Sequence, residues 1–182
     1  MYDVIFKVVI FGDTGSGKTT LRKRYMTNKF VSNSRSTIGV DFETAVLHIN
    51  EIEVKLMIWD FAGEERFRFI FPQYIYGAMG GILMYDITNY SSFSHITDWL
   101  SIIKETNQRF PIILLGAKAD LDNLREVPFR SGMNAANSLG LDEFIECSSK
   151  TGENIKESFV TLTRIMLAKL LTKKRHLQRI AV

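Results

Sequence analysis

The sequence contains one cysteine and three prolines, and it lacks long apolar runs. A lone cysteine, Cys147, excludes an internal disulfide and a zinc site built from cysteines. It also favours a reducing compartment. No apolar run approaches the roughly 20 residues of a membrane-spanning helix. The first residues lack the basic segment and the small-residue cleavage site of a signal peptide. We therefore expect a cytoplasmic protein.

The composition is that of one globular domain. The chain has 182 residues, of which 46% are apolar and 24% charged, and a chain of this size can bury about 70% of its unfolded surface. The net charge of +3 arises in residues 169–182, which hold five basic residues and no acidic one. We therefore divide the chain into a domain, residues 1–168, and a basic C-terminal helix extension, residues 169–182. The other residues have a small net negative charge, so nucleic-acid binding is not expected. Separately, we expect the protein to be a monomer.

Apolar runs typical of strands alternate with helical patterns. The strand-like runs are Val4–Phe11, Phe42–Ile49, Val54–Trp59, Gly81–Tyr85, Ile112–Gly116 and a short strand before Ser148. Helices are expected at Thr19–Thr27, Phe93–Asn107, Phe129–Leu139 (ended by Gly140) and after Asn154, the expected cap, and the second and last of these have apolar residues at helical spacing. The pattern predicts an α/β fold: a six-stranded, mostly parallel sheet flanked by about five helices. Residues 50–53 make a hairpin-like connection, which predicts one antiparallel edge pair.

A glycine-rich motif lies between the first strand and the first helix. Residues Gly12–Thr19 fit G-x-x-x-x-G-K-[ST], and a chance match in a chain of this length is below about 1%. Its backbone N–H groups and the helix N-terminus can cradle phosphates. Lys18 would pair with the β- and γ-phosphates, and Thr19 would offer its hydroxyl to Mg²⁺. The motif predicts a P-loop NTPase domain but does not choose between GTP and ATP.

Two further segments supply groups for a phosphate and a metal. Asp60 ends an apolar strand and can hold Mg²⁺ through water, and Gly63 can offer a backbone N–H to a γ-phosphate. Thr37 could supply a second hydroxyl to Mg²⁺. Each of these signals is weak alone.

Two later segments suit a guanine base. Asp120 follows the fifth predicted strand and can accept two N–H bonds from the guanine edge, while the stem of Lys118 lies along the base. Ser148–Lys150 follows the last strand and can close over the base. Adenine has no matching pair of donors, so these segments favour GTP.

With these motifs in this order, the sequence resembles the Ras superfamily of small GTPases and, within it, the Rab branch. The Rab-like stretches are Thr37–Phe42, Lys55–Phe69 and Tyr85–Thr88, and the resemblance runs from about residue 4 to residue 168. It implies a guanine-nucleotide switch that binds GTP or GDP with Mg²⁺ and slowly hydrolyses GTP. It also implies two loops, residues 32–41 and 63–76, that become ordered with a γ-phosphate and recruit partners in signalling of the membrane-traffic kind.

The resemblance also implies roles for single residues. The catalytic set is Glu64, Lys18 and Gly63. The nucleotide-binding set is Thr14, Gly15, Ser16, Gly17, Lys18, Thr19, Thr20, Phe30, Thr37, Gly63, Lys118, Asp120, Ser148, Ser149 and Lys150. The Mg²⁺ set is Thr19, Thr37 and Asp60. An aromatic triad for effector, exchange-factor and activating proteins is Phe42, Trp59 and Tyr74, for which ordinary core packing is the alternative.

Two residues depart from the family pattern. Glu64 stands where the family has a water-orienting Gln, and its charge is repelled by a γ-phosphate. Ala117 stands where the family has Asn in its N-K-x-D motif, so we expect weaker nucleotide binding. They leave open a second hypothesis, an interaction module of the same fold with little or no turnover. A third is an unrelated P-loop ATP enzyme, against which Lys118 and Asp120 argue.

The C-terminal residues also depart from the Rab pattern. They end in Arg179-Ile180-Ala181-Val182, without the usual cysteines, so we expect no prenyl anchor. Basic residues between Lys169 and Arg179 could make weak contact with an anionic membrane. The alternative is a solvated end of the last helix. We expect a cytoplasmic protein, at most peripheral at membranes without a lipid anchor.

Overall fold

The computed structural model describes residues 2–32 and 37–180, with side chains as far as Lys173. Its centre is a six-stranded sheet of order β2-β3-β1-β4-β5-β6, in which only the β2–β3 pair is antiparallel. The strands are β1 (Val4–Gly12), β2 (Val40–Ile49), β3 (Ile52–Phe61), β4 (Gly80–Asp86), β5 (Ile112–Ala117) and β6 (Glu143–Cys147). The predicted α/β fold, with one antiparallel edge pair, is confirmed.

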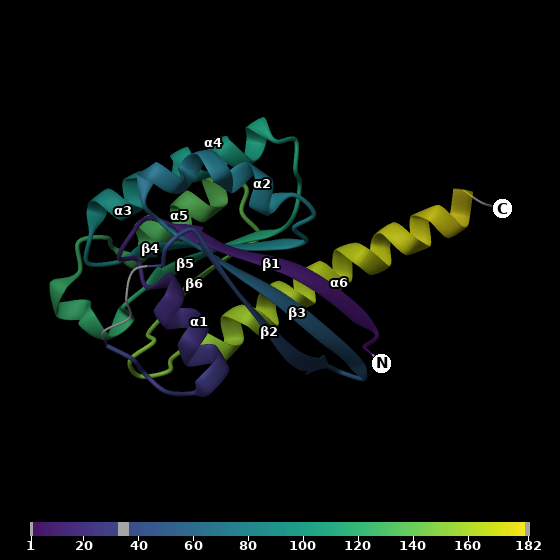
Figure 1. Ribbon diagram of the computed structural model, residues 1–182, viewed down its shortest axis with the longest axis horizontal. Coiled ribbons are helices and arrows are strands. Elements are labelled where there is room, and N and C mark those ends of the chain that lie inside the picture. The colour runs from purple at the N-terminus through teal and green to yellow at the C-terminus, as the bar shows by residue number, and fades with distance from the viewer. Residues whose placement is uncertain (1, 33–36, 181–182) are drawn as a thin grey trace.

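Helices cover both faces of the sheet (Figure 1). The α-helices are α1 (Lys18–Thr27), α2 (Phe71–Ile75), α3 (Tyr90–Ser94), α4 (Ile96–Glu105), α5 (Phe129–Leu139) and α6 (Ile155–Ile180). Two 3₁₀ turns, η1 (Glu65–Ile70) and η2 (Ala119–Leu124), lie beside strand ends. Helices α1 and α6 lie on one face, and α2, α4 and α5 pack on the other.

The buried residues form two clusters, one on each face. One cluster joins residues of the sheet to Leu21 of α1 and Phe159 of α6, and the other joins the sheet to Phe71 of α2 and Trp99 of α4. All seven residues of β4 and all six of β5 are buried, as expected for parallel strands covered on both sides.

Two local predictions were wrong. The predicted helix Phe93–Asn107 is two helices, α3 and α4, separated at His95. The side chain of Asn89 starts α3 early by accepting the Ser92 N–H at 3.3 Å, and the Ser94 hydroxyl bonds to the Ser91 carbonyl at 2.8 Å, a contact that competes with helix continuation. The predicted connection at residues 50–53 is shorter, because β3 begins at residue 52 and only two residues form the turn.

The ends of the last two helices were predicted with mixed success. Helix α5 ends at Gly140, which has φ 68°, and α6 begins directly after Asn154, as expected. However, the Asn154 side chain donates to the Glu146 carbonyl at 2.7 Å rather than accepting from the first turn of the helix. Its backbone carbonyl accepts the Ser158 N–H at 3.0 Å. Figure 1 shows that the C-terminal half of α6 projects from the body. Among the described helices, none has the length and apolarity needed to cross a membrane.

Candidate functional site

A cavity of about 540 Å³ opens at the carboxyl edge of the sheet, where ligands of such folds bind. Fourteen of the predicted site residues line it: Thr14, Gly15, Gly17, Lys18, Thr19, Thr20, Phe30, Thr37, Gly63, Glu64, Lys118, Asp120, Ser149 and Lys150. Segments that are far apart in the sequence are therefore brought to one site. Its volume lies within the range usual for small-molecule pockets.

Three predicted site residues lie behind the lining instead. Ser16, Asp60 and Ser148 each have 0% exposure. The Ser16 hydroxyl donates to the Asp13 carbonyl at 2.8 Å, and the Ser148 hydroxyl donates to the Asp120 carboxylate at 2.6 Å. These side chains hold the loops that form the cavity wall.

The phosphate end of the cavity comprises residues 12–19 together with Thr37 and Asp60. Gly17 takes φ 94° immediately before α1, a left-handed conformation that suits glycine, and the helix N-terminus then faces the cavity. The Lys18 ammonium donates to the carbonyls of Gly12 at 2.7 Å and Asp13 at 2.6 Å. Burial lowers the pKa of Lys18 to about 8, and the charges of Asp60 and Asp13 oppose this shift. This end can bind an anion.

The oxygen atoms of three residues fit a hard divalent cation. The Thr19 and Thr37 hydroxyl oxygens lie 2.7 Å apart. Asp60 is fully buried, and its Oδ1 has no hydrogen-bond partner among the described residues. Burial raises the pKa of Asp60, while the Thr19 hydroxyl and the nearby charges of Arg22 and Lys18 oppose that shift. Hydroxyl and carboxylate oxygens are what Mg²⁺ prefers, so the residues present fit the expected ion.

The position of Asp60 depends on Arg22, which sequence reasoning missed. Arg22, 4% exposed, forms ion pairs with Asp41 and Glu43 of β2 and with Asp60 of β3, the last at 3.3 Å. It thereby joins α1 to the two strands. The only sequence signal for this pairing was the alternation of acidic residues at positions 41 and 43, and it does not identify Arg22 as their partner.

The base end of the cavity comprises residues 117–120 and 148–150. Asp120 accepts the Ser148 hydroxyl, and its Oδ2 lies 4.0 Å from the Lys150 ammonium. Lys118 has φ 67°, and its ammonium pairs with Asp86 of β4 at 2.5 Å. Ala117, 4% exposed, ends β5 and presents only a methyl group. Side-chain ion pairs therefore support this end.

Gly63 joins the phosphate loop to the segment after β3. A Cβ at this position would lie 2.4 Å from the Asp13 carbonyl carbon and the Thr14 nitrogen, so a larger residue would push the two loops apart. The next residue, Glu64, lines the cavity, and its carboxylate pairs with Arg66 at 2.7 Å.

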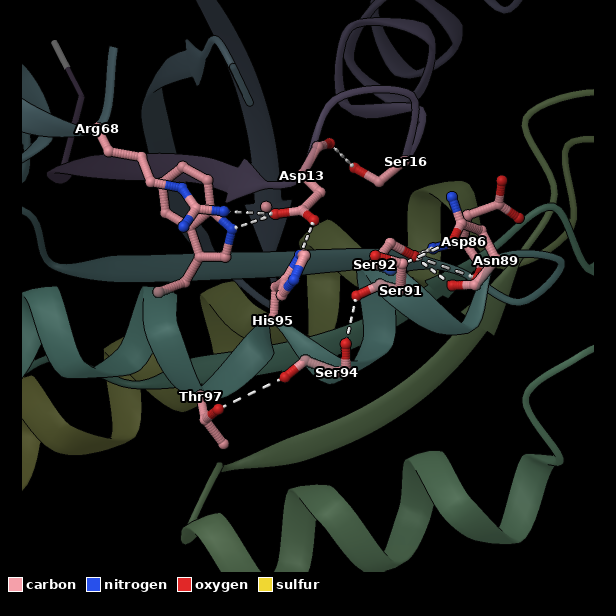
Figure 2. Close-up of polar contacts among 12 residues, drawn as sticks. Asp13, Ser16, Arg68, Asp86, Asn89, Ser91, Ser92, Ser94, His95 and Thr97 are labelled. Carbon is pink, nitrogen blue, oxygen red and sulfur yellow. Dashed lines mark hydrogen bonds and ion pairs between the residues drawn. The ribbon is translucent and has the colours of Figure 1, made fainter. Parts of the chain in front are cut away.

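A second contact between these loops is centred on Asp13, whose role sequence reasoning missed. Its carboxylate accepts from Arg68 at 3.1 Å and from Trp99 Nε1 at 2.8 Å, and it contacts His95 Nδ1 at 2.6 Å. Figure 2 shows Asp13 between Arg68 and His95. The phosphate loop is thus tied to η1 and to the junction of α3 and α4.

The predicted aromatic triad forms one cluster. The ring centroids of Phe42 and Trp59 lie 5.2 Å apart, and those of Trp59 and Tyr74 lie 5.9 Å apart. Phe42 is 46% exposed, whereas Trp59 and Tyr74 are half-buried. Nearby, Phe69 is exposed while Phe71 is in the core, so the phenylalanines of this region divide between surface and interior.

The comparisons with known proteins decide the family. A model of the Ras family matches residues 7–168. The chain belongs to the Ras family of small GTPases. It is 42% identical over 179 residues to Ras-related protein Rab-4 of Dictyostelium discoideum, covering 98% of this chain and 87% of the relative.

Other Rab proteins show a similar likeness. Human Ras-related protein Rab-15 is 42% identical over 167 residues, which cover 91% of this chain and 78% of Rab-15. Bovine Ras-related protein Rab-8B is 41% identical over 170 residues, which cover 93% of this chain and 82% of Rab-8B. The predicted Rab-like resemblance is confirmed, and membership of the Ras family implies that this GTPase binds guanine nucleotide.

Proposed function

We propose that this GTPase is a molecular switch that binds GTP or GDP together with Mg²⁺, hydrolyses GTP slowly and signals through two nucleotide-sensitive loops. The observation that supports this most directly is the single cavity in which the P-loop, Thr37, Gly63, Asp120 and Lys150 meet. The proposal includes signalling of the membrane-traffic kind, by similarity to Rab proteins.

The phosphate end would bind the negative groups of the nucleotide. Lys18 can exchange its two carbonyl acceptors for phosphate oxygens, which gives stronger, charge-assisted hydrogen bonds. Thr14, Gly15 and Thr20 would contact the phosphates as well. Thr19 and Thr37 would hold Mg²⁺, with Asp60 behind them. When bound, the ion supplies positive charge that offsets the charge of the phosphates.

The base end would select guanine. The Asp120 carboxylate can accept two N–H bonds from guanine, while Ser148 holds it in place. Phe30, 42% exposed at the cavity wall, would pack edge-on against the base. Lys118, Ser149 and Lys150 would complete this end.

The two proposed switch loops are residues 32–41 and 63–76. Residues 33–36 of the first loop lie outside the described residues. The second contains η1 and α2, and Gly63 would offer its N–H to the γ-phosphate. Effector, exchange and activating proteins would read these loops through Phe42, Trp59 and Tyr74. The basic extension after residue 168 would add weak contact with anionic membranes, although its side chains beyond Lys173 lie outside the described residues.

The deciding experiment is single-turnover hydrolysis of bound GTP with Mg²⁺ and no partner protein. Wild type is compared with Glu64→Gln, and Lys18→Ala measures contaminating activity. We expect decay on the scale of the intrinsic reaction of Ras, on the order of 10⁻⁴ s⁻¹. Absence of GTP binding would refute the switch.

A second candidate function rests on Glu64, whose carboxylate lines the cavity. If wild type keeps GTP for many hours and Glu64→Gln does not, Glu64 holds the protein in its GTP state. The protein would then serve as a nucleotide-binding interaction module with little turnover, or would depend on an activating protein.

A further inference from the structure

Glu64 and Arg66 form an ion pair at the edge of the nucleotide cavity. Glu64 is part of the cavity wall, whereas 68% of the Arg66 side chain is exposed. Besides its 2.7 Å contact with Glu64, the Arg66 guanidinium lies over the Phe67 ring, 4.8 Å from the centroid. Two contacts therefore direct the positive charge of Arg66 toward the Glu64 carboxylate.

The segment that carries this pair is anchored at both of its ends. On one side, Gly63 packs against the backbone of Asp13 and Thr14. On the other, Arg68 donates to the Asp13 carboxylate (Figure 2), and its guanidinium lies 4.9 Å from the centre of the Trp99 ring. Both anchors lead to the phosphate loop, so Glu64 lies at the phosphate end of the cavity.

The anchoring also distinguishes the two arginines of η1. Arg68 is engaged with Asp13 and Trp99, and its side chain is 23% exposed. Arg66 is therefore the arginine of this turn that can act on Glu64. A carboxylate and a terminal phosphate repel each other, and a guanidinium paired with the carboxylate reduces that repulsion.

We propose that Arg66 is a positioning residue that fixes the Glu64 carboxylate beside the terminal phosphate of GTP and offsets the repulsion between these two groups. This inference rests on the proposed function, because it requires GTP in the cavity. GDP lacks the terminal phosphate, so Arg66 must favour binding of the triphosphate over the diphosphate, and it must do so only while residue 64 is charged.

The test is a double-mutant cycle read by affinity. The dissociation constants of GDP and of the β,γ-imido analogue of GTP are measured with Mg²⁺ for wild type, Arg66→Ala, Glu64→Gln and the double variant. Arg66→Ala is expected to lower the preference for the triphosphate about threefold, the scale of a partly exposed ion pair. In the Glu64→Gln background, the same substitution is expected to leave that preference unchanged.

Two controls separate this role from a general effect of charge or folding. Arg66→Lys keeps the positive charge and is expected to restore most of the preference. Arg130→Ala removes an equal charge from an exposed site on α5 and is expected to change nothing.

If Arg66→Ala lowers the preference for the triphosphate equally in wild type and in Glu64→Gln, Arg66 acts on the phosphate directly. If it changes that preference in neither, Arg66 has no role. Each of these results overturns the inference, while the proposed function stands. If neither nucleotide binds to wild type, the proposed function fails and this inference fails with it.

Discussion

The two ends of the nucleotide cavity differ in the groups that form them: mainly backbone at the phosphate end and mainly side chains at the base end. Most of the phosphate end comes from one continuous loop, residues 12–19, in which backbone carbonyls hold Lys18 and glycine conformations set the shape. The base end is assembled from residues after β5 and after β6, and side-chain contacts such as Ser148 with Asp120 support it. A loop that relies on its backbone tolerates changes in its variable side chains, whereas an end that relies on a few side chains changes its properties with each of them. Ala117, which replaces the Asn of the family's N-K-x-D motif, lies at the base end.

The largest effect is expected at the phosphate end. Lys18→Ala removes the ammonium that would meet two phosphates, and Thr19→Asn replaces a proposed Mg²⁺ ligand. We expect each variant to bind GTP about a hundredfold more weakly or worse, since several charge-assisted hydrogen bonds are lost. Isothermal calorimetry measures the affinity. Lys23→Ala, a lysine of the same helix that does not line the cavity, is the matched control, and an unchanged affinity in Lys18→Ala would rule out this site.

At the base end, Asp120→Asn is expected to change specificity more than overall affinity. Xanthine presents an oxygen where guanine presents an amino group, and an asparagine amide can donate to that oxygen while a carboxylate cannot. We expect the ratio of guanine to xanthine nucleotide affinity to fall about a hundredfold. Competition between GDP and xanthosine diphosphate measures the ratio. Ser148→Ala, which only removes the support of Asp120, should weaken both nucleotides alike, and a constant ratio in Asp120→Asn would mean that Asp120 does not read the base.

Ala117→Asn is expected to strengthen nucleotide binding. The added amide would restore hydrogen bonds at the end of β5, and we expect GDP release to become about tenfold slower. Stopped-flow release of a fluorescent GDP measures the rate. Ala117→Leu fills a similar volume without polar atoms, so it separates hydrogen bonding from packing. Equal release rates in wild type and Ala117→Asn would contradict our explanation of this departure.

The same contrast explains what the sequence could predict. The phosphate loop is contiguous, so the motif at residues 12–19 predicted its strand, its loop and the start of α1 together. The six strands and the antiparallel edge pair followed from alternating patterns and the short connection between two strands, whereas the strand order was seen only in the structure. The base end was predicted from residues that follow two separate strands and was supported by the resemblance, because no contiguous motif joins the segments around residues 120 and 150.

Long-range pairings account for most of what was missed. The contacts of Asp13 with Arg68, His95 and Trp99 join residues more than 50 positions apart, and the pairing of Arg22 with two strands has no local pattern. The break at His95 was missed for a different reason. The apolar spacing from Phe93 to Ile103 continues through it, whereas the side chains of Asn89 and Ser94 determine the helix ends by hydrogen bonds that periodicity does not reveal.

The smallest expected effect concerns pH, and it arises from burial at the phosphate end. Burial lowers the pKa of Lys18 from its usual 10.5 to about 8, so without nucleotide it loses its proton as the pH rises through 8. Phosphates favour the charged form, and binding must then take up a proton. We expect the affinity for GDP to fall about threefold between pH 7.5 and 8.5. The unfolded chain keeps this proton up to its higher pKa, so the nucleotide-free protein should gain stability from Lys18 between about pH 8 and 10.5.

Calorimetry of GDP binding in two buffers of different ionisation enthalpy measures this proton uptake directly. Lys18→Arg provides the control, because a guanidinium stays charged throughout this range. Its affinity for GDP should lose the pH dependence, whatever its absolute value. If wild type binds GDP without net proton uptake at pH 8.5, the ammonium is already charged in the free protein. The carbonyls of Gly12 and Asp13 would then compensate for burial more fully than we infer, and the phosphate end would be prepared for its ligand by charge as well as by backbone shape.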